Sequence, residues 1–317
     1  MTREAQAKRN PIGEIARSLI MPLCTLGLAL YAVVLSQRLS RHVLEGLSLA
    51  INSVLPTGFP FMILCDIYIH LSKRAKRGGF NRLLGKIMGL PVSGIAPLFA
   101  GWICGFPQGA IGADELYRVG ELDKANTERL IPLASLPSLP FIIGGVGLGM
   151  LKSRRQGIII AVSILLSSLI AGIITKRKIT ETNSSTIIIG QKFSIVESIK
   201  KAGASFVTII SFITAFSVLG GALDYVLPGK WLRLVLAMLL EVTRAVKLIS
   251  EASLPEWLKI GLCSCALGVG GLSALLQSRA LVTEGKLSFI PYILIKLLVG
   301  ALSFGISVSI FFLLNAF

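Results

Sequence analysis

Histidine is almost missing from this chain, which has only His42 and His70 among 317 residues. Catalysis by imidazole and a histidine-rich metal site are therefore not expected. The five cysteines all fall in apolar stretches, and Cys263 and Cys265 do not have a metal-ligand spacing. No phosphate-binding glycine loop, zinc-protease motif or nucleophile elbow is present. The sequence thus predicts no enzyme, no metal site and no cofactor.

Charge is also scarce, at 15% of residues, whereas soluble domains carry about 25%. Charge-free runs close to the roughly 20 residues of a membrane-spanning helix recur along the chain. They are 18–37, 46–65, 93–113, 130–151, 156–175, 202–223, 260–278 and 297–317. Basic residues flank membrane helices on the cytoplasmic side, which accounts for the net charge of +16. The expected partner is the lipid bilayer, and nucleic acid is not expected.

Basic residues also predict the orientation, because they gather on the cytoplasmic side of membrane proteins. Segment 1–17 carries Arg3, Lys8, Arg9 and Arg17. Segment 72–87 carries six basic residues and no acidic one. Both segments are placed inside, so the N-terminus is predicted to be cytoplasmic. The basic segment 152–155 must then lie outside.

The run 93–113 contains a break. Gly105-Phe106-Pro107-Gln108-Gly109 cannot be a continuous helix, because proline lacks a donor and clashes with the preceding turn, and glycine weakens a helix. Unpaired backbone at membrane depth is tolerated only inside protein or beside a water-filled cavity. We therefore interpret 93–113 as a re-entrant hairpin that holds something polar at its tip.

The order of features repeats in the second half, where charges interrupt an apolar segment near 231–252 and predict a second hairpin. Each hairpin is followed by a helix that breaks, at 136–140 and at 268–271. Inverted repeats with broken helices are typical of secondary transporters. We therefore predict an all-α polytopic membrane protein with two inverted repeats, re-entrant helical hairpins and broken transmembrane helices. The alternative is a coincidence of the glycine- and proline-rich helices common in membranes.

The predicted organisation has four parts. Residues 1–40 are the N-terminal cytoplasmic segment with the first transmembrane helix, and 41–178 are the first repeat. Residues 179–195 are a polar linker, and 196–317 are the second repeat.

Residues at the breaks are the candidate solute-binding residues. The set is Gly105, Pro107, Gln108, Gly109, Ser135, Ser138, Glu241, Thr243, Arg244, Gly270, Gly271, Ser273 and Gln277. Arg244 is expected to offer its planar guanidinium to a carboxylate, with Glu241 holding it in place. The alternatives are a local Glu241–Arg244 ion pair, and helix–helix hydrogen bonds made by the hydroxyl residues.

Other ionisable residues also lie in apolar segments. Asp66 and His70 are four residues apart on one helix face and are candidates for proton coupling. The alternative is an interfacial pair beside Lys73. Arg279 and Lys296 are each either a buried cation or a side chain that reaches the membrane interface.

The motifs resemble a known family. In the first half, the motifs are Gly105-Phe106-Pro107-Gln108-Gly109-Ala110, Glu128-Arg129-Leu130 and the segment 140–151. In the second half, they are the segment 239–243 and Gly270-Gly271-Leu272-Ser273 with Gln277. Together they resemble the YlbJ family of sporulation integral membrane proteins. The resemblance runs from about Leu44 to the C-terminus. It implies a nucleoside-recognition or Gate domain, and a fold distantly similar to concentrative nucleoside transporters. It also implies a location in the mother-cell-derived membrane around the forespore.

The residues predict a secondary carrier or facilitator for a small anionic solute. The resemblance implies that this solute is dipicolinic acid, moved during spore formation. Two alternatives stay open: a non-transporting membrane assembly factor for the spore envelope, and a nucleoside transporter or sensor. Homo-oligomerisation also stays open.

Overall fold

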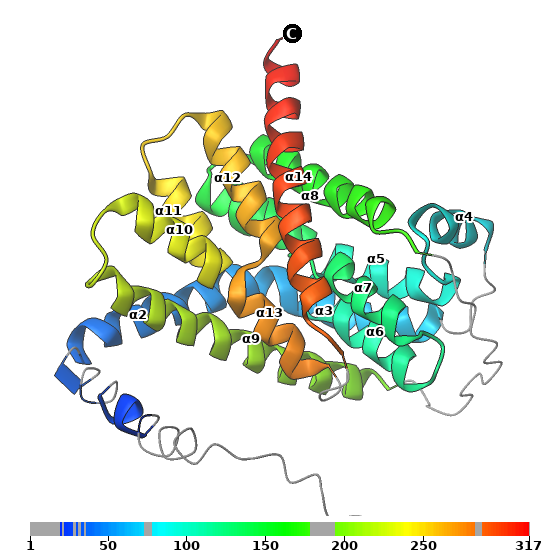
Figure 1. Cartoon of the computed structure of the whole chain (residues 1–317), viewed down its shortest axis with the longest axis horizontal. Coiled ribbons are helices and arrows are strands. Elements are labelled where there is room, and N and C mark those ends of the chain that lie inside the picture. The colour runs from blue at the N-terminus through cyan, green and yellow to red at the C-terminus, as the bar shows by residue number, and fades with distance from the viewer. Residues whose placement is uncertain are drawn as a thin grey trace, which may run out of the picture.

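The computed structural model describes residues 20, 22–27, 30, 33–34, 36–72, 78–177, 194–282 and 287–316. All regular elements in these ranges are helices (Figure 1). Five of them are long and apolar enough to span a membrane, and a bent helix pair would make a sixth. The protein is thus an all-α polytopic membrane protein, as its charge-free runs predict. The predicted cytoplasmic segment 1–17, part of the predicted first helix and most of the predicted linker lie outside the described residues.

The first half begins with one long helical run. Helix α2 (Ser36–Leu49), a π-helical turn (Ala50–Val54) and α3 (Leu55–Ser72) follow one another without a gap. Pro56 has no N–H to donate to the preceding turn. The helix widens to π geometry directly before this proline, where that hydrogen bond is missing.

The first predicted hairpin is present. After α4 (Gly79–Met88) and a 3-10 turn (Val92–Gly94), α5 (Ile95–Cys104) and α6 (Gln108–Arg118) pack against each other. Between them the chain reverses at Gly105-Phe106-Pro107, where Gly105 has a φ of +84°.

The end of the next helix lies against this hairpin. A Cβ atom on Gly101 would lie 1.8 Å from the carbonyl oxygen of Ala134, so only glycine fits at this position of α5. Helix α7 (Lys124–Ala134) begins at Asp123, whose side chain accepts a hydrogen bond from the Asn126 N–H.

The chain then breaks at 135–138, around Pro137, and continues through residues 139–140 into a π-helix, η3 (Phe141–Met150). Helix α8 (Arg154–Ile174) completes the first half.

The second half repeats this order of elements. The long helix α9 (Ile195–Asp224) is followed by α10 (Lys230–Leu240) and α11 (Val242–Glu251), which form the second hairpin. The hairpin turns at one residue, Glu241, whose backbone is extended, with φ −148° and ψ 116°.

Helix α12 (Glu256–Val269) and α13 (Gly271–Leu281) form the second broken helix. Gly270 separates them and Gly271 begins α13, with φ of +79° and +71°. This left-handed region is open to glycine and strained for other residues, so the glycine pair makes the break. Helix α14 (Ile290–Asn315) completes the chain.

The two halves pack closely together (Figure 1). The run α2–α3 lies antiparallel to α9, because His42 contacts Tyr225 and Asp66 contacts Ser198. The start of α8 lies beside the end of α14, where Arg155 donates to the Leu314 carbonyl at 2.8 Å.

Packing across the halves is reciprocal. Helix α7 packs on α14 and α12 packs on α8, while α6 contacts α13 and α11 contacts η3. Each hairpin therefore contacts the broken helix of the opposite half.

A buried arginine connects two helix ends in the first half. Arg129 of α7 is only 4% exposed. Its guanidinium donates to the carbonyls of Met88 and Gly89 at the end of α4, and to the Gly172 carbonyl and the Thr175 hydroxyl at the end of α8. Carbonyls at a helix end have no intrahelical partner, so Arg129 satisfies groups that the helices themselves leave open.

Candidate functional site

A cavity of about 40 Å³ lies where both hairpin tips and both broken helices meet. The long helices α3 and α9 complete its wall. The lining residues are Val54, Gly58, Met62, Cys104, Phe106, Pro137, Ser138, Phe141, Ile209, Ile213, Glu241, Val242, Thr243, Ser273, Ala274 and Gln277.

The polar lining comes from residues that the sequence singles out. Five polar residues line the cavity, and each is 7% exposed or less: Ser138, Glu241, Thr243, Ser273 and Gln277. They come from the first helix break, the second hairpin tip and the start of α13. Three segments far apart in the chain thus contribute polar groups to one small space. The role of these residues in solute binding stays a prediction.

Glu241 shapes the tip of the second hairpin. Its carboxylate accepts the backbone N–H of Thr243 at 3.0 Å and of Arg244 at 2.7 Å. These are among the first N–H groups of α11, and a carboxylate at the positive end of a helix is stabilised there. The expectation that Glu241 holds the Arg244 guanidinium is wrong, because its oxygens bond the backbone instead.

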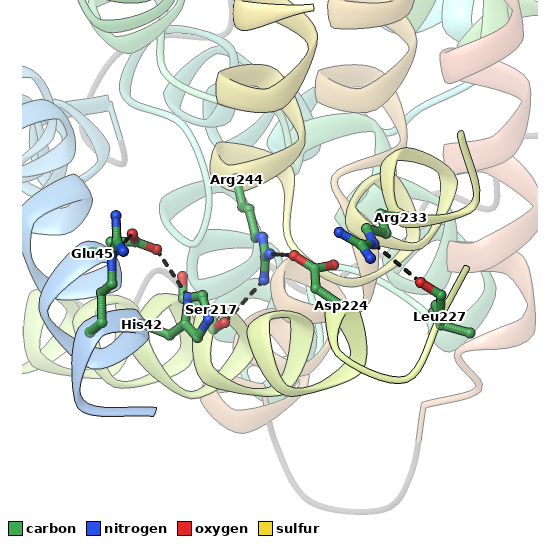
Figure 2. A network of polar contacts seen from close by, with 8 residues as sticks. His42, Glu45, Ser217, Asp224, Leu227, Arg233 and Arg244 are labelled. Carbon is green, nitrogen blue, oxygen red and sulfur yellow. Dashed lines mark hydrogen bonds and ion pairs between the residues drawn. The ribbon is translucent and has the colours of Figure 1, made fainter. Parts of the chain in front are cut away.

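The guanidinium of Arg244 turns away from the cavity, toward α9 (Figure 2). It forms an ion pair with Asp224 and donates to the Ser217 carbonyl at 3.1 Å. Its planar face is therefore occupied by α9, and neither the local Glu241–Arg244 ion pair nor a guanidinium facing the cavity is found. Arg244 connects the second hairpin to the long helix.

The same region contains a second set of contacts (Figure 2). His42 Nδ1 lies 3.0 Å from a carboxylate oxygen of Glu45, one turn away on α2. Near the start of α10, Arg233 donates to the Leu227 carbonyl at 3.2 Å. These contacts position the ends of α2, α9 and α10.

Gln277 is the polar lining residue with an unused group. Its Nε2 donates to the Ser273 hydroxyl at 3.0 Å, while its Oε1 is buried and has no hydrogen-bond partner in the described parts of the chain. A buried carbonyl oxygen without a donor is costly unless a ligand or water supplies one. The cavity therefore presents an acceptor to whatever enters it.

The other residues of the predicted set do not line the cavity. The first hairpin turn and the start of α6 contain Gly105, Pro107, Gln108 and Gly109. The helix breaks themselves contain Ser135, Gly270 and Gly271.

The predicted proton-coupling pair lies elsewhere. Asp66 accepts a hydrogen bond from the Ser198 hydroxyl at 2.6 Å and lies 3.7 Å from Lys201 Nζ, both on α9. The side chain of His70 lies outside the described residues, so this pair stays a prediction.

Sequence reasoning missed the apolar wall. Val54, Gly58 and Met62 are spaced four apart along one face of the first long helix, and Ile209 and Ile213 have the same spacing on α9. This spacing is the signal that could have found them. In an apolar segment, however, the sequence alone does not distinguish a row of residues that faces a cavity from one that faces lipid.

The fold and the cavity define a class: a polytopic helical membrane protein in which paired hairpins and broken helices surround a small, partly polar cavity. The chain is similar to the sporulation integral membrane protein YlbJ of Bacillus subtilis (strain 168), with 25% identity over 305 residues. The match covers 80% of this chain and 73% of that protein. This similarity supports membership of the YlbJ family, as the motifs predict. No protein-family model matches the chain, and no solved structure matches it.

Proposed function

We propose that this protein is a secondary carrier for a small anionic solute, which binds in the cavity between the hairpin tips. The observation that carries the proposal is the convergence of polar groups from the helix breaks and the second hairpin on one enclosed space. Secondary transporters bind their substrates between discontinuous helices near the membrane midplane.

The start of α13 favours an anion. Gly270 precedes this helix and no side chain caps its first N–H groups, while Ser273 and Ala274 of its first turns line the cavity. Free N–H groups and the positive end of the helix dipole attract carboxylates. At α11 the carboxylate of Glu241 already takes this place, which leaves α13 as the end that a solute can use.

The size of the cavity favours alternating access. One water needs about 10–15 Å³ of such space, so a cavity of about 40 Å³ has room for about three waters. An aromatic dicarboxylate is larger, and the hairpin tips must separate to admit it. The repeated order of elements and the antiparallel pairing of α3 with α9 support an inverted repeat, in which one half opens as the other closes.

The proposed cargo is dipicolinic acid, which the family resemblance implies. Its two carboxylates are acceptors for the N–H groups of α13. A nucleoside is the competing cargo, since its N–H groups would satisfy the open Gln277 oxygen.

Uptake of labelled dipicolinate into proteoliposomes tests this proposal, with wild type beside Gln277→Leu, Ser273→Ala and Ser309→Ala. Ser309 is exposed and bonds only the Gly305 carbonyl of its own helix, so it is the matched control for Ser273. We expect saturable uptake by wild type and Ser309→Ala. The amide of Gln277 has a second N–H to offer a carboxylate. Loss of a buried hydrogen-bonding group costs about 1–3 kcal/mol, so KM should rise about 5- to 150-fold in the two cavity variants.

Three results would count against the proposal. Saturable uptake unchanged in Gln277→Leu would remove the cavity as the site. Uptake blocked by nucleosides at lower concentration than by dipicolinate would favour the nucleoside. Absence of uptake of either solute by folded wild type would favour the assembly-factor alternative.

A further inference from the structure

Lys296 is a fully enclosed cation in the last helix. It lies in the second turn of α14 and is 2% exposed, so its side chain is enclosed by protein. Its Nζ donates to the Ser135 carbonyl at 2.7 Å. Arg279, in contrast, is exposed and stacks on the Phe289 ring at 5.2 Å. Lys296 is therefore a buried cation, and Arg279 is not.

The ammonium lies at the junction of the two broken helices. Ser135 directly follows the last residue of α7. A Cβ atom built on Gly270, which ends α12, would lie 3.8 Å from the same Nζ. Two helix carboxyl ends, each with open carbonyls and about half a negative charge, therefore meet at one lysine.

No carboxylate forms an ion pair with the Lys296 ammonium in the part of the chain that the structure describes, and its hydrogen bond goes to a backbone carbonyl. The titratable and charged residues on α14 and on the helices packed against it are Tyr292 (α14), Lys124, Glu128 and Arg129 (α7), Arg154 and Arg155 (α8), and Glu256, Lys259, Cys263 and Cys265 (α12). Only Tyr292 lies within one turn of Lys296 on the same helix.

Unpaired hydroxyls occur next to the lysine in the fold, at Tyr292 one turn away on α14 and at Ser135, whose carbonyl Lys296 bonds. The Tyr292 hydroxyl faces those of Ser278 and Ser135, yet none of the three forms a hydrogen bond of normal geometry in the described chain. All three residues are buried, at 3% exposure or less. Ser278 directly follows Gln277, which lines the cavity. Each of these hydroxyls can both donate and accept a hydrogen bond.

We propose that Lys296 is the coupling site of the carrier and that the coupled ion is a proton. This inference rests on the proposed carrier function. With its proton, the ammonium bonds the Ser135 carbonyl and holds the end of α7 against the α12–α13 break. Without it, the neutral amine is a weaker donor, and the two broken helices separate more readily. The proton leaves to water that enters when the hairpin tips separate, and it is replaced when the carrier faces the opposite side.

The same geometry argues against a sodium ion at this junction. In transporters, half-helix carboxyl ends and unwound carbonyls are the groups that coordinate a coupling cation. Here the lysine side chain fills that position and supplies the positive charge. A second cation would be repelled by the ammonium at short range.

The first experiment separates accumulation from exchange in sodium-free proteoliposomes with the membrane potential clamped. One coupled proton changes the accumulation ratio about tenfold per pH unit. Wild type should therefore accumulate dipicolinate about tenfold under a gradient of about one unit, in one direction of the gradient. Lys296→Met should exchange labelled for unlabelled dipicolinate without accumulating it. Lys230→Met, at the exposed start of α10, should behave as wild type.

Accumulation by Lys296→Met at the wild-type level would overturn the proposal. So would the loss of exchange together with accumulation in folded Lys296→Met, because Lys296 would then act in solute binding or architecture. Accumulation by wild type that follows a sodium gradient and ignores the pH gradient would overturn it as well. If wild type neither accumulates nor exchanges dipicolinate, the proposed function fails with this cargo, and the second experiment decides on Lys296 alone.

The second experiment needs no cargo. Cys104 lines the cavity and is 6% exposed, so its alkylation by N-ethylmaleimide reports separation of the tips. Two proteins with Cys104 as their only cysteine, one with Lys296 and one with Lys296→Met, are compared between about pH 6 and pH 9. The ratio of their rates cancels the ionisation of the thiol itself. The ratio should change severalfold with pH, and a constant ratio would refute the role of Lys296.

Discussion

Replacing Arg129 tests whether this buried guanidinium stabilises the first half of the fold. Its donors reach three carbonyls and one hydroxyl at the ends of α4 and α8. No acid accepts a hydrogen bond from it among the described residues, so its partners are helix ends alone. Arg129→Ala leaves these carbonyls without a donor in a buried region.

The expected magnitude follows from the bonds lost. A hydrogen bond to a charged group contributes about 1.5–3 kcal/mol, but bonds to one group are not additive and water partly replaces them. We expect Arg129→Ala to lower the free energy of unfolding by about 4 kcal/mol. Arg129→Lys should lower it by about 2 kcal/mol, since an ammonium cannot reproduce the planar donor geometry of a guanidinium.

Unfolding by sodium dodecyl sulfate in mixed micelles, followed by tryptophan fluorescence, measures this change. Trp102 is a local reporter because its indole N–H donates to the Leu133 carbonyl of α7 at 3.0 Å. Arg82→Ala, which removes an exposed arginine from α4, is the matched control and should remain within about 0.5 kcal/mol of wild type. A loss below about 1 kcal/mol in Arg129→Ala would refute the reasoning.

Two further substitutions test contacts that position the hairpins. Gly101→Ala places a Cβ atom 1.8 Å from the Ala134 carbonyl oxygen, so the first hairpin must shift. We expect the free energy of unfolding to fall by about 3 kcal/mol. Gly203→Ala, with open space at its Cβ, is the control in the same assay. Asp224→Asn removes the charge opposite Arg244 and should cost about 1–2 kcal/mol. A double-mutant cycle with Arg244→Met should then show coupling above about 0.5 kcal/mol, and strict additivity would contradict the ion pair.

Local chemistry made the breaks predictable. Helices are interrupted at the Gly105–Gly109 turn, at Pro137 and at the Gly270–Gly271 pair, for reasons that lie within a few residues. The structure breaks at these places. The helical hairpins and the polytopic class could therefore be predicted from the sequence.

Long-range contacts could not be predicted in this way. Arg244 finds its acid twenty residues earlier, on α9, while the nearer Glu241 binds backbone N–H groups. Spacing along a helix predicts which side chains share a face. It does not reveal that another helix brings a competing partner, nor that a helix start will take up the local acid.

The reciprocal packing of the halves explains how one buried lysine could act on both hairpins. Each hairpin contacts the second part of the opposite broken helix, α6 on α13 and α11 on η3. The Lys296 ammonium lies where the first parts of those same broken helices, α7 and α12, end. A change in its bond to Ser135 therefore alters the spacing of both broken helices, and each transmits the change to the hairpin of the other half. Coupling of this kind needs a shared element with two arrangements, and we assign that role to the junction of the two breaks. Substitutions along these contacts should therefore change the exchange of solute and the reactivity of Cys104 together.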